Sequence, residues 1–244
     1  MKLKEWDKLT NKYFEEILSP FAKGVDSPIY RTIKSIKNKN KVIDIGTGLG
    51  VLVPFLSKNF KQVVAIDFSE KMIKNAKKKN KQNNVTFLVK DMTKLKEFYN
   101  TFNVAVSINS IIMPSLVDVK KTFQEVYNIL KPNGILIGVF PAIESESYEA
   151  LLTFEREFKK TKDEEKAINN THRLIGDNYD YLTGVINYKG KQKHYYKFEL
   201  DYRLKQIGFN NIKISKVLYP WKVYGGGIFR NKPGIWDWFV IAKK

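Results

Sequence analysis

Cysteine is absent from this chain of 244 residues, and histidine occurs only twice. The absence of cysteine excludes disulfide bonds, thiolate metal ligands and cysteine nucleophiles. Apolar runs are short, and none reaches the 18 residues that suggest a membrane-spanning helix. The first residues, Met1 to Trp6, lack the apolar segment of a secretory signal. We therefore expect a cytoplasmic protein that does not enter a membrane.

Arginine is also scarce. The chain has 43 lysine and arginine residues against 25 aspartate and glutamate residues, which gives a formal net charge of +18. Lysine supplies almost all of this positive charge, whereas recognition of base edges and paired contacts to phosphate rely on arginine. The scattered lysines favour a solvated surface, and a nucleic-acid site stays open as an alternative. The arginines are Arg31, Arg156, Arg173, Arg203 and Arg230.

The most informative stretch is Val-Ile-Asp-Ile-Gly-Thr-Gly-Leu-Gly, which contains Asp44. The apolar residues around this acid indicate a buried strand. Glycine follows at every second position, at Gly46, Gly48 and Gly50, and a helix is expected from Leu49 onward. Glycines at this spacing let the chain turn sharply and let a ligand approach the backbone. The stretch therefore predicts the first half of a nucleotide-binding βαβ unit.

Two further expected strands are also followed by acids. The apolar run 63–66 ends in Asp67, an acid placed to accept hydrogen bonds from the hydroxyls of a ribose. Ser69 then predicts the N-cap of a helix. The run 85–89 indicates a third strand, and Asp91 follows it. Three acids at three successive strand ends are more specific than the glycines alone.

The pattern D-x-G-x-G-x-G, with these later acids, resembles the class I methyltransferases that depend on S-adenosylmethionine (SAM). A dinucleotide fold would place a small residue where this chain has Val51. The resemblance implies SAM as the cofactor and S-adenosylhomocysteine as the product. It assigns cofactor binding to Asp44, Gly46, Thr47, Gly48, Gly50, Asp67, Phe68, Met72, Asp91, Met92 and Asn109.

The resemblance also implies individual roles. The glycine loop lies against the amino acid and ribose of the cofactor, and Asp67 binds the ribose. Phe68 and Met72 flank the adenine, although packing in the core would explain them equally well. Asp91 accepts a hydrogen bond from the adenine amine.

The implied fold is a Rossmann-like α/β sheet of seven mostly parallel strands in the order 3-2-1-4-5-7-6, with helices on both faces. We expect a turn at 131–134 before the fifth strand, and one exposed helix over 144–168. Leu151, Leu152, Phe154 and Phe158 should face inward on that helix. A single domain over 1–244 is expected to comprise N-terminal helices (1–40), a SAM-binding core (41–142), a substrate lid of a helix and a hairpin (143–197), and a C-terminal helix with the last two strands (198–244).

The methyl acceptor should bind beyond the fourth strand, near Asn109, because ligands of open α/β sheets lie at the carboxyl ends of the strands. The Pro-Pro-aromatic sequence that accompanies this position in enzymes methylating adenine or glutamine amino groups is absent, which disfavours that chemistry. Asn109, His172 and His194 are weak candidates for a catalytic role. Aromatic residues are expected to line the acceptor pocket, among them Tyr195, Trp221 and Tyr224.

These features favour in-line methyl transfer to a small-molecule acceptor. One alternative is a nucleic-acid methyltransferase that uses the lysine-rich surface, and another is a SAM-binding protein without catalysis. No ligand cluster predicts a metal site. The acceptor, the methylated atom and the oligomeric state do not follow from the sequence.

Overall fold

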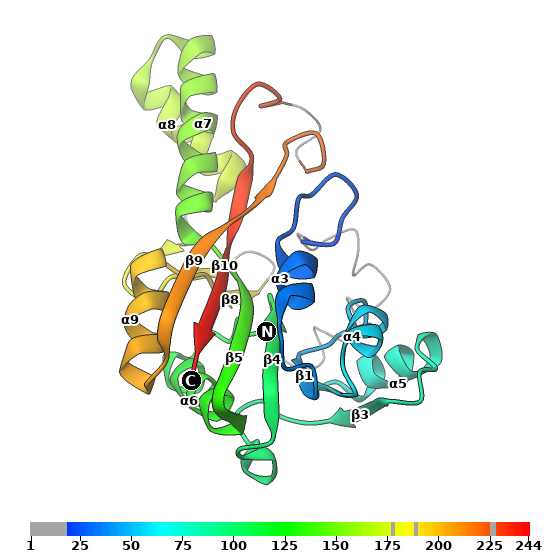
Figure 1. Cartoon of the computed structure of the whole chain (residues 1–244). Helices are drawn as coiled ribbons and strands as arrows, with labels where there is room; N and C mark the ends of the chain where they lie inside the picture. The colour runs from blue at the N-terminus through cyan, green and yellow to red at the C-terminus, as the bar shows by residue number, and fades with distance from the viewer. Residues whose placement is uncertain (1–18, 177–178, 188–189, 225–227) are drawn as a thin grey trace.

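The computed structural model describes residues 19–176, 179–187, 190–224 and 228–244. Its main sheet has seven strands in the order β3-β2-β1-β4-β5-β10-β9 (Figure 1). Counted along the chain within this sheet, that order is the expected 3-2-1-4-5-7-6, since the three short strands β6 to β8 form a separate sheet. The seven strands are β1 (Lys41–Ile45), β2 (Gln62–Asp67), β3 (Val85–Val89), β4 (Phe102–Ile108), β5 (Leu130–Pro141), β9 (Asn210–Tyr219) and β10 (Ile235–Lys243).

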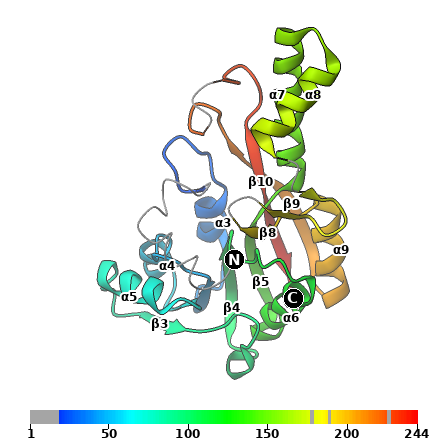
Figure 2. The same cartoon turned by 180° about the vertical axis from the view of Figure 1, so that it is seen from behind.

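Strands β1 to β5 pair in parallel, and β10 runs antiparallel to both of its neighbours. The central strands are apolar on both faces because helices cover both. Figure 2 shows the sheet from behind. Helices α3 (Ile29–Ser35), α4 (Val53–Asn59) and α5 (Glu70–Lys79) cover one face, and α6 (Leu116–Ile129) and α9 (Lys197–Ile207) cover the other.

Two helix starts show how local sequence sets the boundaries. The Ser69 hydroxyl accepts a hydrogen bond from the Met72 N–H, which confirms the expected N-cap of α5. Helix α4 begins at Val53, so the expectation of a helix from Leu49 was wrong. Gly50 has a φ of +74°, which is incompatible with a right-handed helix, and the chain can become helical only after it.

The expected single helix over 144–168 was also wrong. The segment forms two helices, α7 (Ile143–Thr161) and α8 (Glu164–Ile175), that contact each other and project from the body of the molecule (Figure 1). The break falls at Lys162, which is left-handed with φ +57°, and Asp163 caps the second helix. Because this pair leaves the body, Leu151 and Phe158 are exposed instead of facing inward.

The remaining differences are smaller. The expected turn at 131–134 is an irregular first part of β5, where the pairing with β4 shifts register. The expected hairpin exists as β7 (Val185–Asn187) and β8 (Lys191–Lys193), with β6 (Tyr179–Asp180) added beside it. The expected helices before residue 19 lie outside the described residues, as do Tyr188 and the three glycines at 225–227. No helix in the described ranges is long and apolar enough to span a membrane.

Candidate functional site

The loop between β1 and α4 is shaped by its glycines. Gly46, Gly48 and Gly50 all have positive φ, at +71°, +54° and +74°. The Gly46 N–H donates to the Ile66 carbonyl over 2.8 Å, which fixes the loop to the end of β2. A Cβ at Gly46 would lie 2.3 Å from the Cβ of Ser110. Glycine is therefore required here both by backbone conformation and by contact with the segment after β4.

Asp67 stands at the end of β2 and holds this loop. Its Oδ2 accepts a hydrogen bond from the Gly48 N–H at 2.9 Å, and its Oδ1 accepts one from the Ser69 N–H at the same distance. The side chain is buried. The structure thus brings together the second acid and the middle glycine, which the sequence had only placed in the same motif.

Asp44 is buried one strand away. The Thr47 hydroxyl donates a 2.6 Å hydrogen bond to its Oδ2. Burial raises the pKa of Asp44 to about 6, against the opposing effect of that hydrogen bond. The pair ties the end of β1 to the loop that follows it.

The residues expected around the adenine are less uniform. Phe68 is exposed, whereas Met72, on α5, is buried. Asp91 is exposed and accepts hydrogen bonds from the backbone N–H and the hydroxyl of Thr93. Met92 is buried, and its Cε lies 3.6 Å from the place of a Cβ on Gly46. Their roles toward adenine stay predictions.

The segment after β4 links the glycine loop to the other half of the sheet. The Ser110 hydroxyl donates to the Ile45 carbonyl over 2.7 Å. Asn109 is left-handed, with φ +48°, and its Nδ2 donates to Oδ2 of Asp237 over 2.7 Å. Asn109 therefore directly follows β4 in the chain, and its side chain is bound to β10 by a hydrogen bond.

Asp237 is a site residue that sequence reasoning missed. It is 2% exposed and also accepts a 2.6 Å hydrogen bond from the Tyr219 hydroxyl. Burial raises its pKa to about 6, although Tyr219 and Asn109 both stabilise the ionised form. A single acid inside the apolar run Ile-Trp-Asp-Trp-Phe-Val-Ile was the signal that could have revealed it.

Two glutamates of α7, the helix that contacts β10, have raised pKa values. Burial, with the charges of Glu149 and Asp237, raises the pKa of Glu146 to about 7. Burial also raises the pKa of Glu149. Burial, followed by the charges of these glutamates, raises the pKa of Tyr179 to about 12. The Nδ1 of His194 lies 3.5 Å from Oε1 of Glu146. The sequence showed these residues only as part of a charged helix and a tyrosine-rich hairpin.

Comparisons with known proteins agree with this geometry. Residues 42–134 match the family model described as a methyltransferase domain. The chain is 29% identical over 139 residues to the malonyl-[acyl-carrier protein] O-methyltransferase of Bacillus anthracis. The aligned region covers 56% of this chain and 49% of that protein. The chain is also 30% identical over 117 residues to the phosphoethanolamine N-methyltransferase of Plasmodium falciparum, covering 47% and 44%. The chain thus spans less than half the length of these curated relatives.

Solved structures extend the likeness in fold to the whole chain. A structure from Thermotoga maritima, described as a SAM-dependent methyltransferase and possible histamine N-methyltransferase, has a TM-score of 0.61 at 18% identity and covers all of both chains. A SAM-dependent methyltransferase from Methanosarcina mazei has a TM-score of 0.59 at 20% identity and covers 89% of this chain and 97% of that one.

Residues 42–134 thus match a methyltransferase domain, and the chain shares the fold of SAM-dependent methyltransferases. The loop geometry of this domain is compatible with SAM. Three glycines with positive φ follow β1, and the carboxylate of Asp67 is oriented by two N–H donors at the tip of β2. An acid in that place suits a ribose, and the glycines suit close approach of a ligand to the main chain.

The other predicted residues of the methyltransferase lie in varied places. His172 is exposed on α8 and lines a hollow between α7 and α8. Tyr195 was expected to line the acceptor pocket but is fully buried, and its hydroxyl donates to the Ile111 carbonyl. Trp221 is buried too, with its Nε1 donating to the Pro233 carbonyl. These two aromatics therefore pack within the protein. The hydroxyl of Tyr224 accepts from the Ser19 N–H and its ring contacts Tyr219, next to Asp237.

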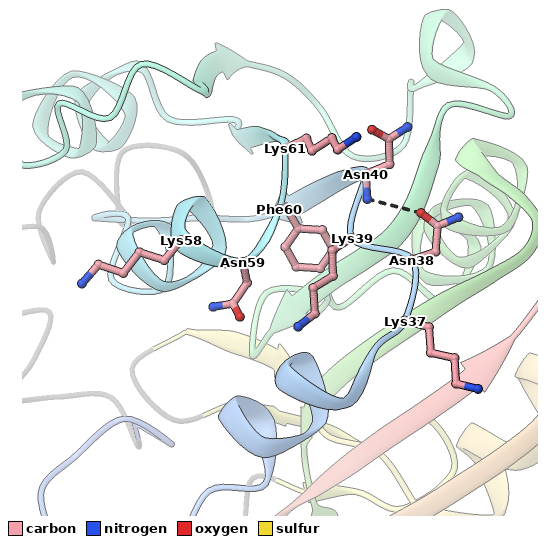
Figure 3. Close-up of a pocket in the computed structure, with 8 residues that line it drawn as sticks. All are labelled: Lys37, Asn38, Lys39, Asn40, Lys58, Asn59, Phe60 and Lys61. Carbon is pink, nitrogen blue, oxygen red and sulfur yellow. Dashed lines mark hydrogen bonds between the residues drawn. The ribbon is translucent and has the colours of Figure 1, made fainter.

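A second hollow, of about 680 Å³, lies at the opposite edge of the sheet (Figure 3). The loops that precede β1 and β2 form it, at the amino ends of those strands. Cofactors of open α/β sheets bind at the carboxyl ends, so this hollow is separate from the methyltransferase site. Its lining residues are Lys37, Asn38, Lys39, Asn40, Lys58, Asn59, Phe60 and Lys61.

Proposed function

We propose that this protein transfers the methyl group of SAM to a small-molecule acceptor. The observation that carries the proposal is a continuous set of contacts. It runs from Asp67 through the glycine loop to Ser110, and from Asn109 to Asp237 at the carboxyl edge of the sheet. A cofactor held at the first end would direct its methyl group toward the second.

The sulfonium cofactor supplies a methyl group that is already activated by positive charge. The protein must then hold the acceptor in line with that group and exclude water, effects together worth roughly 7–11 kcal/mol in favourable cases. A general base is needed only for an acceptor that carries a proton, and it typically contributes about 10²–10⁴-fold. The buried acids near Asn109 are available for that task.

The small size of the acceptor is supported by the surroundings of this edge. Figure 1 shows that α7 and α8 lie toward the end of the molecule where β5 leads into α7. Residues 220–224 and 228–234, between β9 and β10, and residues 19–28, before α3, lie toward the same end. The relatives named above include enzymes whose names specify small or carrier-bound acceptors. The role of residues 143–197 as a lid belongs to the same proposal.

The first test is binding followed by turnover. Calorimetry should show that SAM binds and NADH does not. Gly48→Val should abolish SAM binding while thermal unfolding stays cooperative, because a β-branched residue is strained at a φ of +54°. Formation of S-adenosylhomocysteine with a metabolite panel would separate an enzyme from a SAM-binding protein without catalysis. A response to NADH alone would refute the proposal.

A nucleic-acid acceptor is the second candidate, and the hollow of Figure 3 is the observation that favours it. Four lysines and three asparagines line it, without a carboxylate. Binding through phosphates requires that log affinity fall with log salt, with a slope of about −0.7 per contact for single strands. A filter-binding series with a single-stranded RNA between about 50 and 200 mM salt tests this. A flat salt dependence would exclude that candidate.

A further inference from the structure

We infer that the acceptor of this methyltransferase is an alkylamine, bound as its ammonium ion by the carboxylates of Glu146, Glu149 and Asp237. The inference rests on the proposed function and names the substrate class of the same site. It follows from the composition of the site, from its position and from one buried nitrogen atom.

The three acids have no lysine or arginine partner among the described residues, although basic residues outnumber acidic ones by 43 to 25 in this chain. Among the described residues, Glu149 and Asp237 form no ion pair, and Glu146 meets only His194. Buried like charges raise each other's cost of ionisation. A cationic ligand would offset that cost.

His194 provides an independent sign of a missing ligand. Its Nδ1 is buried and makes no hydrogen bond with the described residues. It faces Oε1 of Glu146 at 3.5 Å, beyond a good hydrogen bond. Buried polar atoms without a partner are rare in folded proteins and call for a bound group or water. An ammonium ion or a water held by it, placed beside Glu146, would satisfy this atom.

The acids lie on the acceptor side of the sheet. Asp237 is hydrogen-bonded to Asn109, and the next residue, Ser110, contacts Gly46 of the cofactor loop. The N–H of Trp236, next to Asp237, donates over 2.8 Å to the hydroxyl of Ser145, next to Glu146. A ligand held among the acids is therefore close to the end of β4, where the methyl group is expected.

Tyrosine rings lie beside Asp237. Tyr219 and Tyr224 stand edge to face with ring centroids 5.4 Å apart, and Tyr219 donates to Asp237. Tyr179 interacts with the charges of both glutamates. Carboxylates combined with aromatic faces favour ammonium groups. The same arrangement repels carboxylate and phosphate acceptors, which gives specificity by exclusion.

The reaction balances with these groups. The bound ammonium ion gives one proton to the carboxylate of Glu146, which leaves a neutral amine and a neutral acid. The lone pair of the amine forms the new N–C bond as the C–S bond of the sulfonium breaks, and that electron pair stays on sulfur. The product is a methylated ammonium ion with S-adenosylhomocysteine. An alkylamine has this free lone pair, unlike the planar amino groups disfavoured above.

The test uses matched ligands and the full-length protein. Calorimetry at pH 7.5, with S-adenosylhomocysteine present, compares 2-phenylethylamine, 1,4-diaminobutane and ethanolamine with 2-phenylethanol, 1,4-butanediol and ethylene glycol. At least one amine should bind tenfold or more tightly than its alcohol. With SAM, the same amine should gain one methyl group on nitrogen, as read by mass spectrometry. If no amine binds more tightly than its alcohol, the inference is overturned.

Variants separate this inference from the proposed function. Glu146→Gln should weaken amine binding at least tenfold and leave SAM affinity unchanged, which also shows that the variant folds. Glu155→Gln, an exposed acid on the same helix, should change neither. Loss of SAM binding in the wild-type protein would refute the proposed function itself. Unchanged amine binding in Glu146→Gln would refute only the ammonium site.

The pH dependence gives a further readout. The groups facing Glu146 are Glu149, Tyr179, His194 and Asp237. Amine affinity should rise from pH 5.5 to pH 7.5 as Glu146 and Asp237 ionise, since the ligand stays charged throughout this range. Glu146→Gln should reduce that rise. An affinity that falls over the same range would contradict binding by carboxylates.

Discussion

At the scale of single residues, Asp237 decides the character of the acceptor side. Its neighbours in β10 are aromatic or aliphatic, and its carboxylate is nevertheless almost completely buried. Two neutral donors, Tyr219 and Asn109, partly offset the cost of burial. A buried acid that has only neutral partners lowers the free energy of unfolding when it is ionised. This effect can be measured as a dependence of stability on pH.

Asp237→Asn should become more stable relative to the wild type as the pH rises. Burial raises the pKa of Asp237 to about 6 from an ordinary value of 3.8, so the folded state binds the proton more tightly than the unfolded state. Wild-type stability therefore falls between about pH 4 and pH 6, by up to about 3 kcal/mol at 1.36 kcal/mol per unit. Urea unfolding across this range measures the difference. Asp118→Asn, on the exposed surface of α6, is the control and should show no such trend.

Asp67→Ala should weaken SAM binding by about 1.5–3 kcal/mol, the range for hydrogen bonds to a charged group. The substitution also removes the acceptor that positions Gly48, so it affects both the ribose contact and the loop. Titration calorimetry provides the measurement. Asp26→Ala, whose carboxylate is on the surface, serves as the control. Equal affinity in Asp67→Ala and wild type would place Asp67 outside the site.

At the scale of elements, the projecting helix pair is the part of the chain that local rules described least well. Its residues favour helix throughout, and the chain turns at Lys162 in a left-handed conformation that glycine adopts more easily. The αα turn is stabilised by the cap at Asp163 and by contact between the helices. Because position 162 is occupied by lysine, a substitution by glycine is expected to stabilise the turn.

Lys162→Gly should stabilise the protein by about 1 kcal/mol, because a left-handed L-residue costs roughly 1–2 kcal/mol and glycine avoids most of that cost. Lys159→Gly, three residues earlier in the same helix, should instead destabilise by about 1 kcal/mol. Thermal and urea unfolding of both variants give the comparison. Two shifts of the same sign would mean that the turn at Lys162 is not the strained position.

At the scale of the whole molecule, charge is the dominant feature. A formal net charge of +18 on 244 residues produces repulsion that opposes the folded state. The Debye length shortens from about 30 Å at 0.01 M salt to about 3 Å at 1 M. Added salt therefore screens the repulsion between distant surface charges, whereas it has little effect on contacts within the core.

Raising sodium chloride from about 0.02 to about 0.5 M should therefore raise the unfolding temperature by several degrees, because added salt screens exposed charges. Differential scanning fluorimetry measures this, with sucrose at matched osmolality as a control for general solvent effects. A lower unfolding temperature at high salt would show that exposed ion pairs outweigh repulsion.

Much of the expected cofactor site could be predicted from the sequence, because its residues lie close together in the chain. Strand, glycine loop and acid follow one another within a short stretch, so Asp44, Gly46 and Asp67 are recognisable by spacing alone. The acceptor half draws on β4, α7, β9 and β10, which are far apart in the chain. Tyr195 illustrates the consequence: it looked like a pocket residue, but packing against Phe123 and Phe140 buries it.

The amino-acid sequence by itself determined the glycine loop and the acids that follow the first three strands, since each depends on neighbours in the chain, and its resemblance to a family implied the strand order. Only the tertiary structure decided that Asp237 meets Asn109 and that the start of α7 contacts β10. Those contacts depend on β10 inserting antiparallel beside β5 and on where α7 leaves the sheet. Residues 109 and 237 carry no mutual signal along the chain, because their proximity arises from the folding of the whole sheet.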